Sequence, residues 1–197
     1  SVDKMQYSSS LAAALSYLLL RQRDSVGLVT FSERLDCYIP ARSGPRHLQV
    51  LLHAIDRIRP GGKTDLAQTF HMLAQRLRRR GLVIVISDLL DDKERVLPAL
   101  RHLRHGKHEV IVFHILDPNE LAFRFSGPLV LEDLETRRKL VLDPRLVRNH
   151  YQQSLKSFLE DFRRRCGDSR IDYHPITTNL PFDRALLAYL EKRSRLA

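Results

Sequence analysis

The sequence has no tryptophan, only two cysteines and no long uninterrupted apolar run. Cys37 and Cys166 lie far apart without CxxC or Cys/His spacing, which gives no sign of a disulfide framework or a zinc site. The longest apolar stretch, residues 11–20, is interrupted by Ser16 and Tyr17 and is shorter than the roughly 20 residues of a membrane-spanning helix. The chain also begins without an export signal. We therefore expect a cytoplasmic protein with no membrane segment in this chain, while an upstream signal or anchor stays an open alternative.

Patterns typical of nucleophilic or phosphate-binding enzymes are also missing. There is no Gly-x-Ser-x-Gly turn, and no serine or cysteine is linked by spacing to a histidine and a carboxylate. Gly62-Lys63-Thr64 imitates the end of a Walker A loop. However, the position five before Gly62 is Arg57 rather than glycine, and it falls in an expected helix rather than after a strand. We therefore expect a protein that is not an enzyme.

Length and composition favour one globular unit. With 197 residues, 43% of them hydrophobic, the chain can bury one sizeable core, and we expect a single domain over residues 1–197. The formal net charge of +10 is typical of proteins that bind nucleic acid. The basic runs 78–80, 163–165 and 192–193 fall instead where helices should end, and cations are favoured there by the helix dipole. A basic nucleic-acid or anionic-surface binder is therefore the alternative function, and we do not expect nucleic acid as the partner.

Apolar periodicity predicts alternating helices and strands. Helices are expected over residues 11–20, 48–58, 66–77, 96–103, 155–166 and 182–190. Strands are expected over 26–31, 82–86, 110–116 and 171–176, with an antiparallel strand over 35–39 and a hairpin from 129–131 to 139–142. This alternation predicts an α/β fold in three layers, with a mostly parallel sheet and helices on both faces.

Polar residues follow several of these strands directly. Ligands bind at the carboxyl ends of the strands in such folds, and those ends carry Ser32, Asp88 and Asp117, with Thr64 in a loop that leads into a helix. The oxygens of Thr64 and Asp88 suit Mg²⁺ or Mn²⁺, but two ligands do not complete an octahedral site. Thr64 or Asp65 can also simply cap a helix, and so can Asp88.

Asp91, Asp92 and His114 are expected to have structural roles. Asp91 and Asp92 are expected to form the solvated start of a helix. His114 lies between Phe113 and Ile115 in an apolar strand and is expected to be a core histidine with satisfied hydrogen bonds rather than a ligand or base.

The order of several short segments carries a resemblance to a known family. These segments are Lys4-Met5-Gln6-Tyr7, Asp24-Ser25-Val26-Gly27-Leu28-Val29, Gly61-Gly62-Lys63-Thr64-Asp65, Val85-Ile86-Ser87-Asp88, Glu132-Asp133-Leu134-Glu135-Thr136 and 183–190. Over essentially its whole length the chain resembles the bacterial family called domain of unknown function fifty-eight. Members resemble von Willebrand factor A domains, which are Rossmann-like, and are often encoded beside MoxR-type AAA ATPases. The resemblance implies a protein-binding module that works with such an ATPase in assembly or in a chaperone-like role.

The resemblance also implies a metal-ion-dependent adhesion-type face. In the family pattern Thr64 is the metal-site threonine and Asp88 the aspartate after the fourth strand. We expect Ser32, Gly62, Lys63 and Asp117 to lie on the partner-binding face. The Asp-x-Ser-x-Ser loop has no counterpart here, so we expect a domain truncated at its amino end, with the first strand missing. Mg²⁺ or Mn²⁺ is then a cofactor of the full-length protein, and this chain binds neither.

The expected first strand would lie between residues 26–31 and 82–87. Without it, two apolar strands lack a neighbour, and unpaired backbone groups are costly when buried and prone to association when exposed. We therefore expect the 197-residue chain to be marginally stable or oligomeric.

Overall fold

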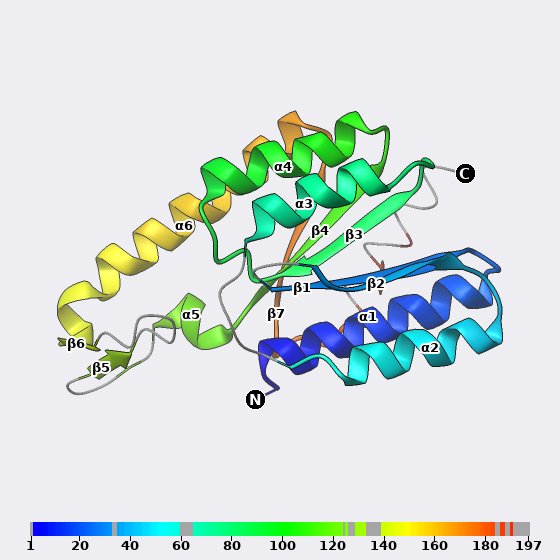
Figure 1. The fold of residues 1–197 in the computed structure, drawn as a ribbon. Coiled ribbons are helices and arrows are strands. Elements are labelled where there is room, and N and C mark those ends of the chain that lie inside the picture. The colour runs from blue at the N-terminus through cyan, green and yellow to red at the C-terminus, as the bar shows by residue number, and fades with distance from the viewer. Residues whose placement is uncertain are drawn as a thin grey trace.

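The computed structural model describes residues 2–32, 35–59, 65–123, 125, 129–132, 139–183, 186, 187 and 190 (Figure 1). Its helices are α1 (Lys4–Arg21), α2 (Pro45–Asp56), α3 (Leu66–Arg76), α4 (Lys93–His105), α5 (Pro118–Ala122) and α6 (Pro144–Asp168). Its strands are β1 (Val26–Phe31), β2 (Leu35–Arg42), β3 (Leu82–Ser87), β4 (Glu109–Leu116), β5 (Leu129–Glu132), β6 (Lys139–Leu142) and β7 (Asp172–Thr177). The expected final helix over 182–190 lies partly outside these described residues.

The parallel sheet contains β3, β4 and β7, in that order. Its register pairs Val83 with Val110 and Ile111 with Asp172. β1 and β2 form a separate antiparallel ribbon, and β5 and β6 form the predicted hairpin. Within the described part of the chain no backbone ladder joins β1 to β3. In the described residues the β1–β2 ribbon and the parallel sheet are therefore separate sheets.

The side chains of β4 explain how this sheet is covered on both faces. Val110 and Val112 point into one apolar cluster, whereas Ile111, Phe113 and Ile115 point into a second cluster. Successive side chains of a strand alternate between its two faces, so the two clusters lie on opposite sides of the sheet. β4 is almost wholly buried because both faces are packed, which explains its continuous run of apolar residues.

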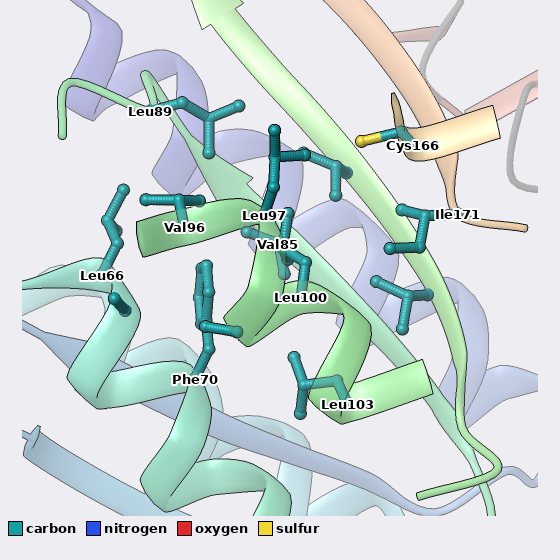
Figure 2. Close-up of a cluster of buried hydrophobic side chains, with 14 of the residues drawn as sticks. Leu66, Phe70, Val85, Leu89, Val96, Leu97, Leu100, Leu103, Cys166 and Ile171 are labelled. Carbon is teal, nitrogen blue, oxygen red and sulfur yellow. The ribbon is translucent and has the colours of Figure 1, made fainter. Parts of the chain in front are cut away.

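The first cluster joins α3, α4 and α6 to the sheet (Figure 2). Phe70 of α3, Leu100 of α4 and Phe162 of α6 are buried to within 2% exposure. Burial of one such side chain contributes about 1.5–3 kcal/mol, so this cluster is the main source of stability on that face. Phe31 of β1 packs edge-on against Phe70, which brings the ribbon onto the same cluster despite the missing ladder.

The second cluster lies beneath α1. Tyr7, Leu11 and Leu15 recur at helical spacing along one side of α1 and pack with Ile111 and Phe113 of the sheet. α2 lies beside α1 in Figure 1 and packs against it. The expectation of a parallel sheet with helices on both faces is thus confirmed for the strands β3, β4 and β7.

Five helices begin at an aspartate. The caps of α1, α3, α4, α5 and α6 are Asp3, Asp65, Asp92, Asp117 and Asp143, and each side chain accepts a backbone N–H of the first turn. The choice between Thr64 and Asp65 is therefore settled for the cap of α3, which is Asp65. The interpretation of Asp92 as the start of a helix is confirmed.

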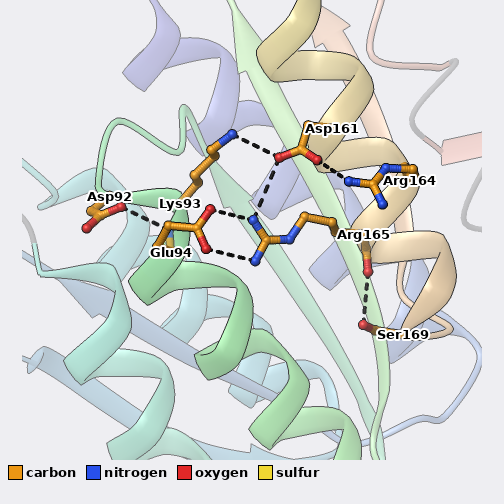
Figure 3. Close-up of polar contacts among 7 residues, drawn as sticks. All are labelled: Asp92, Lys93, Glu94, Asp161, Arg164, Arg165 and Ser169. Atoms are coloured by element: carbon orange, nitrogen blue, oxygen red, sulfur yellow. Dashed lines mark hydrogen bonds and ion pairs between the residues drawn. The ribbon is translucent and has the colours of Figure 1, made fainter.

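Ion pairs join α4 to α6 on the surface (Figure 3). Both terminal nitrogens of Arg165 contact the carboxylate of Glu94, at 2.5 and 3.0 Å, and Lys93 Nζ lies 2.9 Å from Asp161 Oδ2. Hydrogen bonds from Lys93 and from Arg164 lower the pKa of Asp161 to about 2. The basic run over residues 163–165 lies near the end of α6, as expected, and ion pairs with Glu94 and Asp161 neutralise part of it.

Candidate functional site at the ends of β3 and β4

An acidic cluster with one lysine lies where β3 and β4 end. Asp88 follows β3, and Glu120 lies in α5, directly after β4. Lys4, the first residue of α1, places its Nζ 3.0 Å from Asp88 Oδ2 and 2.7 Å from Glu120 Oε1. Because the carboxyl ends of neighbouring parallel strands meet at the same edge of a sheet, three distant segments converge here. We call Lys4, Asp88 and Glu120 the edge cluster.

The edge cluster is partly open to solvent. Its three side chains are 24%, 36% and 34% exposed, for Lys4, Asp88 and Glu120 respectively, so their attraction is partly screened. Partial burial disfavours the charged ammonium, but the hydrogen bond to Glu120 and the charge of Asp88 outweigh it and raise the pKa of Lys4. The lysine is therefore charged at neutral pH, and with two carboxylates the cluster carries a net charge of about −1.

A buried histidine supports the edge cluster from below. His114 Nε2 lies 2.9 Å from the carbonyl oxygen of Asp88, and His114 Nδ1 lies 2.5 Å from the hydroxyl of Tyr173. Because a carbonyl can only accept, Nε2 carries the hydrogen, and Nδ1 of the neutral ring accepts the hydroxyl hydrogen. Burial lowers the pKa of His114 to about 4. The prediction of a core histidine with satisfied hydrogen bonds is confirmed.

Hydrogen bonds also hold the first turn of α3 against two neighbouring loops. The backbone N–H of Asp65 donates to the carbonyl of Ser32 at 3.2 Å, and the N–H of Leu66 donates to Asp91 Oδ2 at 2.9 Å. Arg95 reaches Asp65 at 2.8 Å. Asp91 directly precedes the cap of α4, as expected, and is partly exposed. Its carboxylate also connects the loop after β3 to the start of α3, a longer-range contact that the sequence analysis did not predict.

The structure brings together only some of the residues predicted for the partner-binding face. Asp117 meets the edge cluster because its backbone N–H donates to Glu120 Oε2 at 3.0 Å. Ser32 lies instead beside Asp65, and its hydroxyl donates to Asp36 Oδ1 at 3.0 Å. The remaining predicted positions, Gly62, Lys63 and Thr64, lie outside the described residues. Asp88 and Asp117 are thus the predicted positions that belong to one site.

The described residues do not fit a divalent cation at Asp88. In the part of the chain that the structure describes, no group of three or more His, Cys, Asp or Glu side chains is placed to hold a metal ion. The carboxylate of Asp88 already faces the ammonium of Lys4, which would repel a second cation. The other predicted ligand, Thr64, lies outside the described residues.

Lys4 and Glu120 are the site residues that the sequence analysis missed. Their ion pair joins positions 116 residues apart, and no local pattern predicts a pair at that separation. One signal was available for Glu120. The segment Asp117-Pro118-Asn119-Glu120 matches a capping box, and both of its reciprocal hydrogen bonds are present in α5.

Comparison with known sequences identifies relatives in mycobacteria. The chain is 30% identical over 149 residues to the Mycobacterium tuberculosis protein named "Uncharacterized protein Rv1480", a match that covers 73% of this chain and 46% of the relative. It is 36% identical over 115 residues to "Uncharacterized protein MAV169" of Mycobacterium avium, which covers 55% of this chain and 66% of that relative. The chain thus spans about half the length of the Mycobacterium tuberculosis protein.

Solved structures with the same fold come from Bacteroides. The chain resembles a conserved hypothetical protein BatB from Bacteroides thetaiotaomicron with a TM-score of 0.58 and 11% identity, over 97% of this chain and 88% of that one. It also resembles an aerotolerance-related membrane protein from Bacteroides fragilis with a TM-score of 0.56 and 13% identity, over 88% and 81% of the two chains. None of the helices described in the present chain is long and apolar enough to cross a membrane.

The family resemblance noted in the sequence is confirmed by a direct match. The model of the family described as "Protein of unknown function DUF58" matches residues 1–158, which is most of the chain. This match includes Lys4, Asp88, His114 and Glu120, and therefore the whole edge cluster with its supporting histidine. The chain belongs to the DUF58 family.

Proposed function

We propose that this chain is part of a protein-binding module and that the edge cluster is the centre of its contact face. The observation that carries the proposal is the position of Lys4, Asp88 and Glu120 at the carboxyl ends of β3 and β4, where α/β folds bind their ligands. The three charged groups are partly exposed, and a partner side chain can therefore reach them. The proposed module acts by binding alone, without a catalytic step.

The chemistry of the cluster suggests how a partner is recognised. The two carboxylates share one ammonium, and Lys4 contacts Oδ2 of Asp88, so a guanidinium or ammonium group of a partner can pair with Asp88 Oδ1. His114 fixes the backbone of Asp88 and so limits the positions available to its carboxylate. Charge and fixed position together give specificity, because a partner with an acidic side chain at this point would be repelled.

The proposed partner is a MoxR-type AAA ATPase, with which the module would work in an assembly or chaperone-like role in the cytoplasm. Support comes from membership of the DUF58 family. The von Willebrand factor A-like, three-layer architecture and the association with such an ATPase are what the sequence resemblance implies, and they are part of this proposal. A metal-ion-dependent form of the contact, with Mg²⁺ or Mn²⁺ near Thr64 and Asp88, belongs to this proposal only for a longer protein. It would require Lys4 to move away from Asp88.

The test is a binding measurement with the purified MoxR-type ATPase of the same organism. Asp88→Asn should weaken binding by about tenfold, because the substitution removes a charge at the centre of the interface. Asp56→Asn, at the exposed end of α2, is the matched control and should bind like wild type. Thermal unfolding of both variants establishes that they are folded. Wild-type affinity in a folded Asp88→Asn variant would contradict the proposal.

The same variants distinguish the proposed function from the alternative function, which is based on the net charge of +10. A nucleic-acid or anionic-surface binder would show steep salt dependence, with affinity falling as salt displaces the phosphate contacts. Removal of the negative charge of Asp88 would then leave binding unchanged or make it tighter. That outcome, measured with duplex DNA and with anionic vesicles, would favour the alternative.

A further inference from the structure

A pair of histidines faces each other between α3 and α4, outside the edge cluster. His71 lies on the exposed face of α3, and the half-buried His102 lies on α4. Their Nδ1 atoms are 2.9 Å apart and their ring centroids 5.2 Å apart. The two helices are held in contact by the first apolar cluster, and a hydrogen bond between the two Nδ1 atoms holds the rings at this separation.

The separation of the two nitrogens matches a specific coordination geometry. A metal ion binds imidazole nitrogen at about 2.0–2.1 Å, and two nitrogens 2.9 Å apart would then subtend about 90° at the ion. Tetrahedral coordination would need a separation of about 3.3 Å. An angle near 90° belongs to neighbouring positions of a tetragonal or octahedral ion, which Cu²⁺ and Ni²⁺ prefer.

The surroundings limit what else can coordinate. Asp65 and Glu94 lie along the same surface depression as His71, but they are paired with Arg95 and Arg165 respectively. Gln68 and Gln75, one turn on either side of His71, also line this depression. Among the described residues no third His, Cys, Asp or Glu joins the pair as a ligand. Water would therefore complete the coordination, and the ion must bind imidazole strongly.

We propose that His71 and His102 form a two-histidine surface site for a divalent transition metal, with Cu²⁺ bound most tightly and Ni²⁺ and Zn²⁺ more weakly. The order follows the general affinity series for nitrogen ligands, and the angle disfavours Zn²⁺ further. Mg²⁺ prefers oxygen and does not bind this site. The bound ion bridges α3 and α4 and therefore stabilises the folded chain.

The experiment is calorimetric titration of the purified chain with CuCl₂, NiCl₂, ZnCl₂ and MgCl₂. His71→Ala and His102→Ala should each reduce the affinity for Ni²⁺ and Cu²⁺ by about tenfold or more, because each substitution removes one of the two protein ligands. His53→Ala, on α2, is the matched control and should leave both affinities unchanged. Both histidines lie at exposed or half-buried positions, so the variants are expected to fold. Thermal unfolding is the measurement that checks this.

Two further measurements distinguish this site from weak binding elsewhere. Electron paramagnetic resonance of the Cu²⁺ complex should show two nitrogen ligands in wild type and one in each variant. Affinity should be lower at about pH 5.5 than at neutral pH, because protons compete with a metal ion for imidazole nitrogen. Asp65, Glu94 and Arg95, the charged groups along this depression, remain ionised at that pH. Unchanged Cu²⁺ and Ni²⁺ affinity in both variants would overturn the proposal and leave the pair as an N–H···N hydrogen bond.

Discussion

His114 of β4 donates from Nε2 to the carbonyl oxygen of Asp88, the residue that follows β3. This bond places a neutral imidazole directly beneath the acidic edge cluster. Tyr173 of β7 completes the arrangement by donating its hydroxyl to Nδ1. The position of Asp88 therefore depends on all three strands of the parallel sheet, and on the protonation state of one buried ring.

The first prediction concerns pH. The folded pKa of His114 is about 4, below its ordinary value of 6.5, because the buried ring resists protonation. The unfolded chain takes up this proton first as pH falls, so stability is undiminished above pH 6.5 and decreases between 6.5 and 4. The full loss is about 3 kcal/mol. Urea unfolding at a series of pH values measures this loss.

Two variants assign this loss to His114. His114→Gln keeps a donor for the carbonyl of Asp88 but cannot titrate, so the slope of unfolding free energy against pH should flatten between about pH 6.5 and 5, where few carboxylates titrate. Tyr173→Phe should lower stability by about 1–3 kcal/mol at all these pH values and keep the slope, since the ring still titrates. An unchanged slope in His114→Gln would show that another group causes the acid sensitivity.

The second prediction concerns Mg²⁺. We expect the chain to show no saturation at on the order of millimolar Mg²⁺, because the ammonium of Lys4 occupies the carboxylate of Asp88. Lys4→Met removes this competing charge and should increase Mg²⁺ affinity, whereas Lys4→Arg should not. A longer form that supplies the Asp-x-Ser-x-Ser loop should bind more tightly than either. Calorimetry decides, and tight Mg²⁺ binding by the wild-type chain would refute the prediction.

The third prediction concerns association. Within the described residues β1 pairs only with β2, and β3 pairs only with β4, so each leaves one edge without a ladder. We expect the chain to be oligomeric or marginally stable, because exposed strand edges pair with other strands. Light scattering over a concentration series, combined with thermal unfolding, tests this. A monodisperse monomer as stable as the longer form would show that the expected first strand does not belong between β1 and β3.

Apolar periodicity predicted the elements that form the core. The strands around Val85 and Val112 and the helix around Phe70 appear where the sequence analysis placed them. Their buried positions need apolar side chains, and the spacing of those side chains along the sequence reveals a helix or a strand. α6 begins at Pro144, well before the expected residue 155. Its first half is largely polar and exposed, so periodicity is weak there, but Asp143-Pro144 carried the signal of a cap followed by proline.

The candidate site was less accessible to sequence reasoning. Asp88 could be placed at the edge of the sheet because it directly follows a buried strand. The lysine that neutralises it comes from the start of α1, and an ion pair across the fold leaves no periodic trace in the sequence. The same reason applies to His71 and His102, which meet only because α3 packs beside α4. Long-range pairs of this kind require the three-dimensional arrangement.

The strand order has a consequence for synthesis of the chain. β4 is the middle strand, and its partners are β3, which precedes it, and β7, which follows only after α6. The nascent chain can pair β3 with β4 early, but one edge of β4 stays open until residue 177 has left the ribosome. Throughout that interval the nascent chain is exposed to association through β4, the strand that is most completely buried once folding ends.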